Sequence, residues 1–117
     1  MQLFLLHPNF VDAKIDDHAQ RYYCPHCALI EGILHYYPSI RNAITVNYVD
    51  FIRPRQSIIA LIGEENQSCP VLILDKEEAS DINTSYFKNY KELFFINSTE
   101  LIARFFSERF GVAQMHP

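Results

Sequence analysis

The segment Cys24-Pro25-His26-Cys27-Ala28-Leu29-Ile30 decides how this chain is interpreted, because it places two thiols at the start of an expected helix. Apolar residues recur at helical spacing over residues 28–37. Pro38 ends this helix at or before the preceding residue. Pro25 suits the first helical position, where its missing N–H has no partner to lose. The pattern therefore predicts Cys24 at the N-cap of the helix.

A second segment, Ser68-Cys69-Pro70-Val71-Leu72-Ile73-Leu74, carries the third thiol and the next strong structural signal. Its last four residues are all apolar, which is typical of a strand buried on both faces. We therefore expect this strand to lie in the centre of a sheet, with Cys69 and Pro70 at its entrance.

The remaining pattern predicts alternating strands and helices. Short apolar or β-branched runs predict strands at residues 3–6, 45–51 and 93–96. Pro54 opens a second helix that Gly63 ends. Asn97 and Glu100 form a cap ahead of a last helix, whose Phe105, Phe106 and Phe110 are expected to pack in the core. The order is β-α-β-α-β-β-α, in a single domain over residues 1–111 with a flexible C-terminal tail at residues 112–117.

Composition limits the functional classes. The chain has 117 residues, of which 49% are hydrophobic and 21% charged, as expected of one soluble globular domain. Its net charge of −4, without a Lys/Arg cluster, argues against a nucleic-acid partner. The apolar runs are too short for a signal peptide or a membrane span. We expect a cytoplasmic protein, in which cysteines serve redox, catalytic or metal chemistry. Nothing in the sequence indicates an oligomeric state.

This order of elements, with Cys-x-x-Cys after the first strand and a proline before the third, resembles the thioredoxin-like fold over residues 3–110. Pro25-His26 is similar to the active-site pair of DsbA-type oxidoreductases. The whole pattern, including Tyr22-Tyr23 and Arg53-Pro54-Arg55, resembles a family of small thioredoxin-like proteins of unassigned function. The resemblance implies an α/β fold with a central mixed four-stranded sheet flanked by helices. It also implies that Pro70 is a cis-proline beside the dithiol.

The expected chemistry is thiol-disulfide exchange. A thiolate at Cys24 would accept hydrogen bonds from free backbone N–H groups and lie at the positive end of the helix dipole. We therefore expect Cys24 to be the nucleophile, His26 and Pro25 to support it, and Cys27 to resolve the mixed disulfide. This hypothesis describes an oxidoreductase that acts on protein or small-molecule thiols and disulfides, with a redox-active disulfide and no other cofactor.

The substrate groove is expected around the central strand. By resemblance, Pro70 positions the substrate and the backbone of Cys69 offers it hydrogen bonds. The third thiol departs from redox relatives, which usually carry Val, Ile or Thr at that position. Cys69 is therefore either a second resolving thiol or a small buried apolar residue. Ser68 and Gln67 are candidates to line the same groove.

The alternative hypothesis is a binding module without turnover. A zinc site would combine Cys24, Cys27 and Cys69 with His26, His7 or His18. Residues 96–102 look like the last helix of glutathione-binding relatives, in which a hydroxyl such as that of Ser98 and backbone N–H groups hold a carboxylate. Arg53 and Arg55 are either anion ligands or, by default, solvated surface residues.

Overall fold

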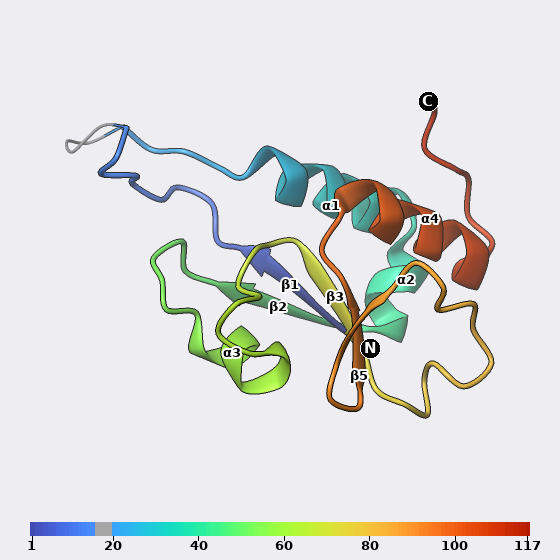
Figure 1. The fold of residues 1–117 in the computed structure, drawn as a ribbon. Helices are drawn as coiled ribbons and strands as arrows, with labels where there is room; N and C mark the ends of the chain where they lie inside the picture. Colours follow the sequence, from blue (N-terminus) through green and yellow to red (C-terminus); the bar gives the residue numbers. More distant parts are fainter. Residues whose placement is uncertain (16–19) are drawn as a thin grey trace.

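The computed structural model describes residues 1–15 and 20–117. Its helices and strands, in chain order, are β1 (Gln2–Leu6), α1 (Pro25–Tyr36), α2 (Pro38–Ala43), β2 (Thr45–Val49), α3 (Gln56–Ile62), β3 (Val71–Leu74), β4 (Lys88–Tyr90), β5 (Leu93–Ile96) and α4 (Thr99–Phe110). Within the described residues, five strands form one sheet in the order β2-β1-β3-β5-β4 (Figure 1).

The sheet is mixed, as expected, but it is wider than the four strands that the sequence predicts. β1 pairs with β2 in parallel and with β3 in an antiparallel direction. β5 pairs with β3, and the additional strand β4 pairs with β5 at the edge. β4 has only three residues, Lys-Asn-Tyr, and exposes most of them, so it carries no hydrophobic signal. It forms because Lys91-Glu92 turns the chain back onto β5.

Helices cover both faces of this sheet (Figure 1). On one face α1, α2 and α4 pack on alternate sheet positions such as Leu3, Leu72 and Ile96. On the other face α3 packs on the intervening positions, such as Phe4 and Ile73. All four residues of β3 are buried. β3 is therefore the central strand that its apolar sequence predicts.

The structure adds a short helix after α1 and shortens β2 relative to the prediction. α1 ends at Tyr36, as predicted, but Pro38 then occupies the first turn of a new short helix, α2. Proline suits that place because it has no N–H to leave unsatisfied. β2 ends at Val49 rather than at Phe51. The Phe51 ring stacks on Phe10 instead, with centroids 4.3 Å apart.

The starts of α3 and α4 also differ from the prediction. α3 begins at Gln56 rather than at Pro54, because the carbonyl of Arg55 accepts the first helical hydrogen bonds. The N-cap of α4 is Ser98 rather than Asn97, and its Oγ accepts a hydrogen bond from the Leu101 N–H at 3.3 Å. Ser and Asn are comparable N-cap residues, so their order in the sequence did not decide which one caps.

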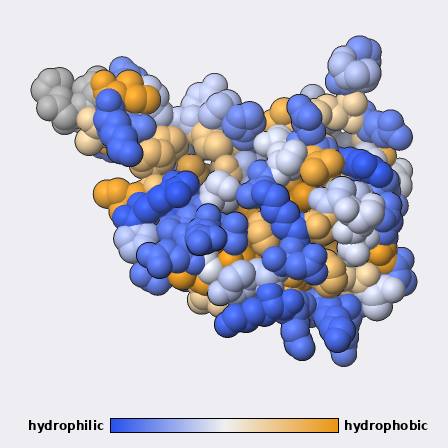
Figure 2. All heavy atoms as spheres, viewed as in Figure 1, coloured by the Kyte–Doolittle hydropathy of each residue, from blue (hydrophilic) through white to orange (hydrophobic). Residues whose placement is uncertain are grey.

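An arm made of two neighbouring chain segments projects from the end of the sheet where α1 begins (Figure 1). It comprises residues 7–15 and 20–23, which are joined by reciprocal backbone hydrogen bonds between Phe10 and Tyr22. Figure 2 shows hydrophobic residues interspersed with hydrophilic ones on this arm. Ile15 is 70% exposed, and Ile52 in the neighbouring loop is 76% exposed. The arm thus exposes some large apolar side chains near the end of the sheet where α1 begins.

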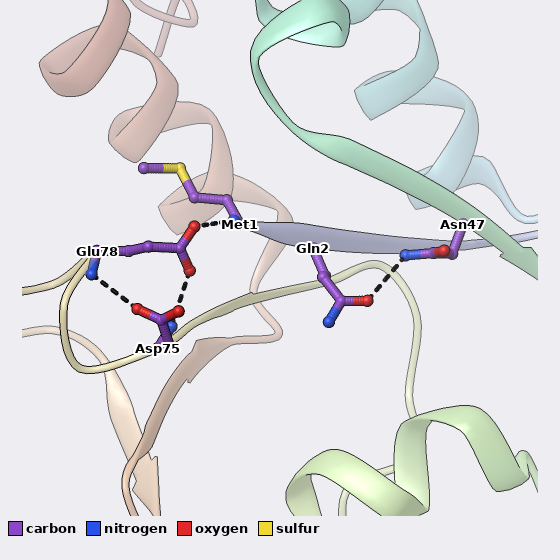
Figure 3. A network of polar contacts seen from close by, with 5 residues as sticks. All are labelled: Met1, Gln2, Asn47, Asp75 and Glu78. Atoms are coloured by element: carbon purple, nitrogen blue, oxygen red, sulfur yellow. Dashed lines mark hydrogen bonds and ion pairs between the residues drawn. The ribbon is translucent and has the colours of Figure 1, made fainter.

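The opposite end of β1 is held by polar contacts (Figure 3). The Met1 ammonium pairs with the Glu78 carboxylate. Glu78 and Asp75 exchange hydrogen bonds between side chain and backbone N–H at 2.8 and 2.9 Å. These contacts fix the connection that follows β3 against the start of β1, far along the strand from the thiols.

Two glycines make a matched stability test. Gly63 has φ 88° and ψ 162°, and a Cβ there would lie 2.7 Å from the Tyr90 ring. Gly63→Ala should therefore lower the free energy of unfolding by about 2 kcal/mol. Gly32 lies within α1 with open space around it, so Gly32→Ala should raise stability by about 0.5–1 kcal/mol. Urea denaturation measures both, and equal effects would contradict the assignment of strain to Gly63.

Candidate functional site

Cys24 is the N-cap of α1, as the sequence predicts. Its backbone is extended, with φ −76° and ψ 116°, and Pro25 follows in the first turn. The Cys24 Sγ accepts a hydrogen bond from the Cys27 N–H at 3.1 Å. The sulfur is partly exposed, lies at the positive end of the helix dipole and can be reached from outside. These are the features that an attacking thiolate requires.

Cys27 lies one turn further along α1 and is only 5% exposed. Its Sγ accepts a hydrogen bond from the Leu6 N–H at 3.5 Å, so the end of β1 holds it in place. Burial, together with the hydrogen bond to the Cys24 side chain, raises the pKa of Cys27 to about 12. The two thiols are therefore chemically different, since Cys27 remains a protonated thiol at neutral pH.

The Cys69-Pro70 peptide bond is cis, as the resemblance implies. Cys69 is partly buried and packs against the hydrophobic clusters on both faces of the sheet. Burial raises the pKa of Cys69 to about 11, while the positive charge of Arg55 acts in the opposite direction. Charge on Cys24 also raises this pKa. Cys69 is thus both a packed residue and an electrostatic neighbour of the dithiol.

One surface hollow of ≈ 330 Å³ gathers most of the other predicted site residues. Its lining includes His26, Cys69, Pro70 and Ser98, together with the first turn of α4. Ser68 lies beside it, where its Oγ accepts a hydrogen bond from Asn97 Nδ2 at 3.4 Å. The Ser98 hydroxyl is already engaged as the cap of α4. The hollow therefore brings His26 and Pro70 together, whereas the Ser98 hydroxyl is less available for a carboxylate.

The structure corrects the expectation for Arg55 and Gln67. Arg55 is 7% exposed rather than a solvated surface residue, and Gln67 is 8% exposed rather than a groove residue. The Arg55 guanidinium donates to the carbonyls of Asp50 at 3.2 Å, Phe51 at 2.5 Å and Gln67 at 2.8 Å. The Gln67 Oε1 accepts from the Arg55 backbone N–H at 2.9 Å. This clamp holds the loop before Cys69 against the loop after β2.

The clamp could not be predicted from the sequence, because no local pattern distinguishes the buried arginine from the exposed one. Arg53 and Arg55 flank Pro54 symmetrically in the sequence, yet Arg53 is exposed and Arg55 is buried. Burial lowers the pKa of Arg55. Its guanidinium also lies 5.8 Å from the centroid of the Phe51 ring. The clamp thus connects the loop that carries Cys69 to the aromatic pair Phe10-Phe51 at the base of the arm.

The candidate metal ligands do not converge. Among residues 1–15 and 20–117, no group of three His, Cys, Asp or Glu side chains has a geometry that could hold a metal ion. His7 instead stacks on the Tyr48 ring at 5.6 Å. His18 lies outside the described residues. Within the described residues, the geometry therefore gives no support to the zinc alternative.

These features define a mixed α/β domain with a close Cys-x-x-Cys pair at a helix N-terminus. A family model described as "Protein of unknown function (DUF3088)" matches residues 1–114, and the chain belongs to this family. No curated protein and no solved structure gives a significant match. Across the described ranges, none of the helices has the length and apolar character needed to cross a bilayer.

The thiols should differ in reactivity toward iodoacetamide. In the reduced protein at pH 8, Cys24 should be alkylated first because it is partly exposed at the helix N-terminus. Cys69 should react slowly, with a rate that rises about tenfold per pH unit until the pH approaches 11, because only the thiolate reacts. Peptide mass spectrometry over a pH series measures this order.

Denaturant provides the control for this experiment, since all three thiols should then react alike. The Cys69→Ser variant confirms which peptide carries the slow site. Alkylation of Cys69 as fast as that of Cys24 in the native protein at pH 8 would contradict the protected state of Cys69.

Proposed function

We propose that this protein is a thioredoxin-like thiol-disulfide oxidoreductase. The observation that carries the proposal is the placement of Cys24 at the N-cap of α1, with its sulfur hydrogen-bonded to the Cys27 N–H and with a protonated, buried Cys27 behind it. The order of elements supports the fold assignment. When α2 and β4 are set aside, the chain retains the order β-α-β-α-β-β-α that the resemblance implies.

The mechanism begins when the Cys24 thiolate attacks one sulfur of a substrate disulfide. A Cys24-substrate mixed disulfide forms, and the other substrate sulfur leaves as a thiolate that takes a proton from water. Cys27 then loses its proton and attacks the Cys24 sulfur, which releases the second substrate thiol. Two electrons pass from the dithiol to the substrate, and the protein is left with a Cys24-Cys27 disulfide. A reducing compartment such as the cytosol would restore the dithiol.

Two further residues support this sequence of steps. His26 is exposed at the mouth of the hollow that also contains Pro70, so it is placed to meet an incoming chain next to Cys24. Pro70 lines the same hollow and immediately precedes β3. We assign His26 a role in stabilising anionic sulfur near the dithiol and Pro70 a role in positioning the substrate.

A stoichiometric assay tests the proposal. Reduced protein should reduce a protein disulfide, such as that of insulin, and should end with one Cys24-Cys27 disulfide per chain by mass spectrometry. Cys24→Ser should abolish this reaction, whereas Cys69→Ser should retain it. Equal reduction by the wild type and by Cys24→Ser would reject the oxidoreductase function.

A further inference from the structure

A second hollow, of ≈ 290 Å³, opens beside the dithiol and is distinct from the one that contains His26 and Pro70. It lies between one face of α1 and the ends of β1 and β2. Cys24, Cys27, Ala28 and Glu31 contribute to it from α1, at the spacing that places helical residues on one side. At 1.5 Å per residue, this row is about 10 Å long. Both thiols of the pair therefore stand at one end of a short trough.

The walls of this trough, which we call the α1 trough, are mainly apolar. Leu5, Leu6 and Pro8 line it, and Tyr23 at its rim is 66% exposed. These residues come from the end of β1 and from both sides of the arm. They present hydrophobic surface within reach of the partly exposed Cys24 sulfur, and a volume near 300 Å³ suits a small organic molecule.

The far end of the α1 trough is polar but neutral. Glu31 is the one ionisable carboxylate in the described lining, and it is already satisfied. One of its oxygens pairs with the Arg41 guanidinium, and Oε2 accepts a hydrogen bond from the Tyr48 hydroxyl at 2.5 Å. A ligand carboxylate would lose its hydration here without meeting a free cation, which is unfavourable. The charge pattern at this end of the trough thus disfavours a carboxylate such as those of glutathione and favours an uncharged group there.

We propose that the α1 trough binds a small uncharged organic disulfide and presents its S–S bond to Cys24. This inference rests on the proposed oxidoreductase function and names a substrate class for it. The apolar body of the disulfide lies along Leu5, Leu6 and Ala28, and one sulfur faces the Cys24 Sγ. The reaction is the thiol-disulfide exchange described under the proposed function. The Cys24-Cys27 dithiol supplies two electrons and two protons, and the substrate R–S–S–R becomes two R–SH molecules.

The experiment uses single-turnover reduction by the full-length reduced protein. The probes are 4,4′-dithiodipyridine, which is uncharged at pH 8, and glutathione disulfide, which is charged. Ala28→Phe fills the trough from an exposed position on α1. It should lower the ratio of the two rate constants, uncharged over charged, by about tenfold, which corresponds to about 1.4 kcal/mol.

Leu29→Phe is the matched control, because Leu29 is the next residue of α1, is 40% exposed and lies outside the trough lining. It should leave the ratio of rate constants within about twofold of the wild-type ratio. A change of that size is well below the tenfold fall expected for Ala28→Phe. Circular dichroism confirms that each variant is folded, and Ala28→Leu replaces Ala28→Phe if the larger side chain prevents folding. An unchanged ratio in the folded Ala28 variant, or an equal fall in Leu29→Phe, would overturn the assignment of the trough.

Cys24→Ser separates this inference from the proposed function. If Cys24→Ser reduces both probes as fast as the wild type, the oxidoreductase function itself fails. If reduction depends on Cys24 but the Ala28 variants do not change the ratio, the function stands and the uncharged substrate class is rejected.

Discussion

Under the proposed mechanism, Cys27→Ser should stop the exchange at a mixed disulfide between Cys24 and the substrate. The physical reason is that the two cysteines have different roles: Cys24 is partly exposed and forms the mixed disulfide, whereas Cys27 is buried directly behind it and resolves it. Without the second thiol, nothing at that position can attack the Cys24 sulfur. Turnover with a protein disulfide should fall at least about 100-fold, and a covalent adduct of one substrate per chain should accumulate.

Non-reducing electrophoresis and intact-mass analysis measure this adduct. The matched control is Cys69→Ser, which removes a thiol from the same neighbourhood and should release substrate normally. Rapid release by Cys27→Ser, with no adduct and no other disulfide, would contradict the resolving role of Cys27.

The same experiment determines what the third thiol does. If Cys69 can replace Cys27 as the resolving thiol, Cys27→Ser will release part of its substrate and form a Cys24-Cys69 disulfide. The double variant with Cys27→Ser and Cys69→Ser will then hold the adduct longer than the single variant. Because burial raises the pKa of Cys69 to about 11, we expect this route to be slow at neutral pH and faster as the pH rises toward 11. Peptide mapping identifies which cysteines are joined.

Arg55→Met should cause the largest loss of stability among single substitutions in the loops around the site. Methionine is of comparable length but removes the donor to the buried carbonyl of Gln67 and the donors to the partly buried carbonyls of Asp50 and Phe51. An unsatisfied buried acceptor costs about 1 kcal/mol or more and the two partly buried acceptors cost less each, so the free energy of unfolding should fall by about 2 kcal/mol. The midpoint of thermal unfolding should fall by about 10 °C.

Arg53→Met is the matched control for this prediction. It removes the same side chain two residues earlier from an exposed position, and should change stability by less than about 0.5 kcal/mol. Arg55→Lys should lie between the two, because lysine keeps the charge but cannot donate three hydrogen bonds in a planar fork. Equal stability of Arg53→Met and Arg55→Met in urea denaturation would show that the clamp contributes nothing.

Local signals accounted for the parts of the fold that depend on sequence neighbours. Pro25 and Cys24 marked the start of α1, Gly63 marked the end of α3, and the continuous apolar run at residues 71–74 marked the central strand. Each of these features acts through the backbone within a few residues of itself. The cysteine pair was visible for the same reason, since its spacing and its place at a helix start are both local.

Local signals were weaker where two neighbouring residues offer similar chemistry or where a segment is short. Ser98 rather than Asn97 caps α4, although either side chain can accept the hydrogen bond. β4 and α2 were not anticipated, because three exposed residues and a short helix after Pro38 carry little hydrophobic pattern. β4 forms because β5 offers it backbone partners, whereas α2 makes its own helical hydrogen bonds and buries Ile40 in the core.

By itself the sequence determined an α/β domain, a dithiol at a helix N-terminus and a proline before a central strand. Only the tertiary structure decided which polar residues are buried and which surfaces meet around the thiols. Arg55 and Gln67 are separated by 12 positions but form one clamp, and the α1 trough joins β1, α1, β2 and the arm. Burial and cavity shape depend on contacts between distant segments, so no local pattern encodes them.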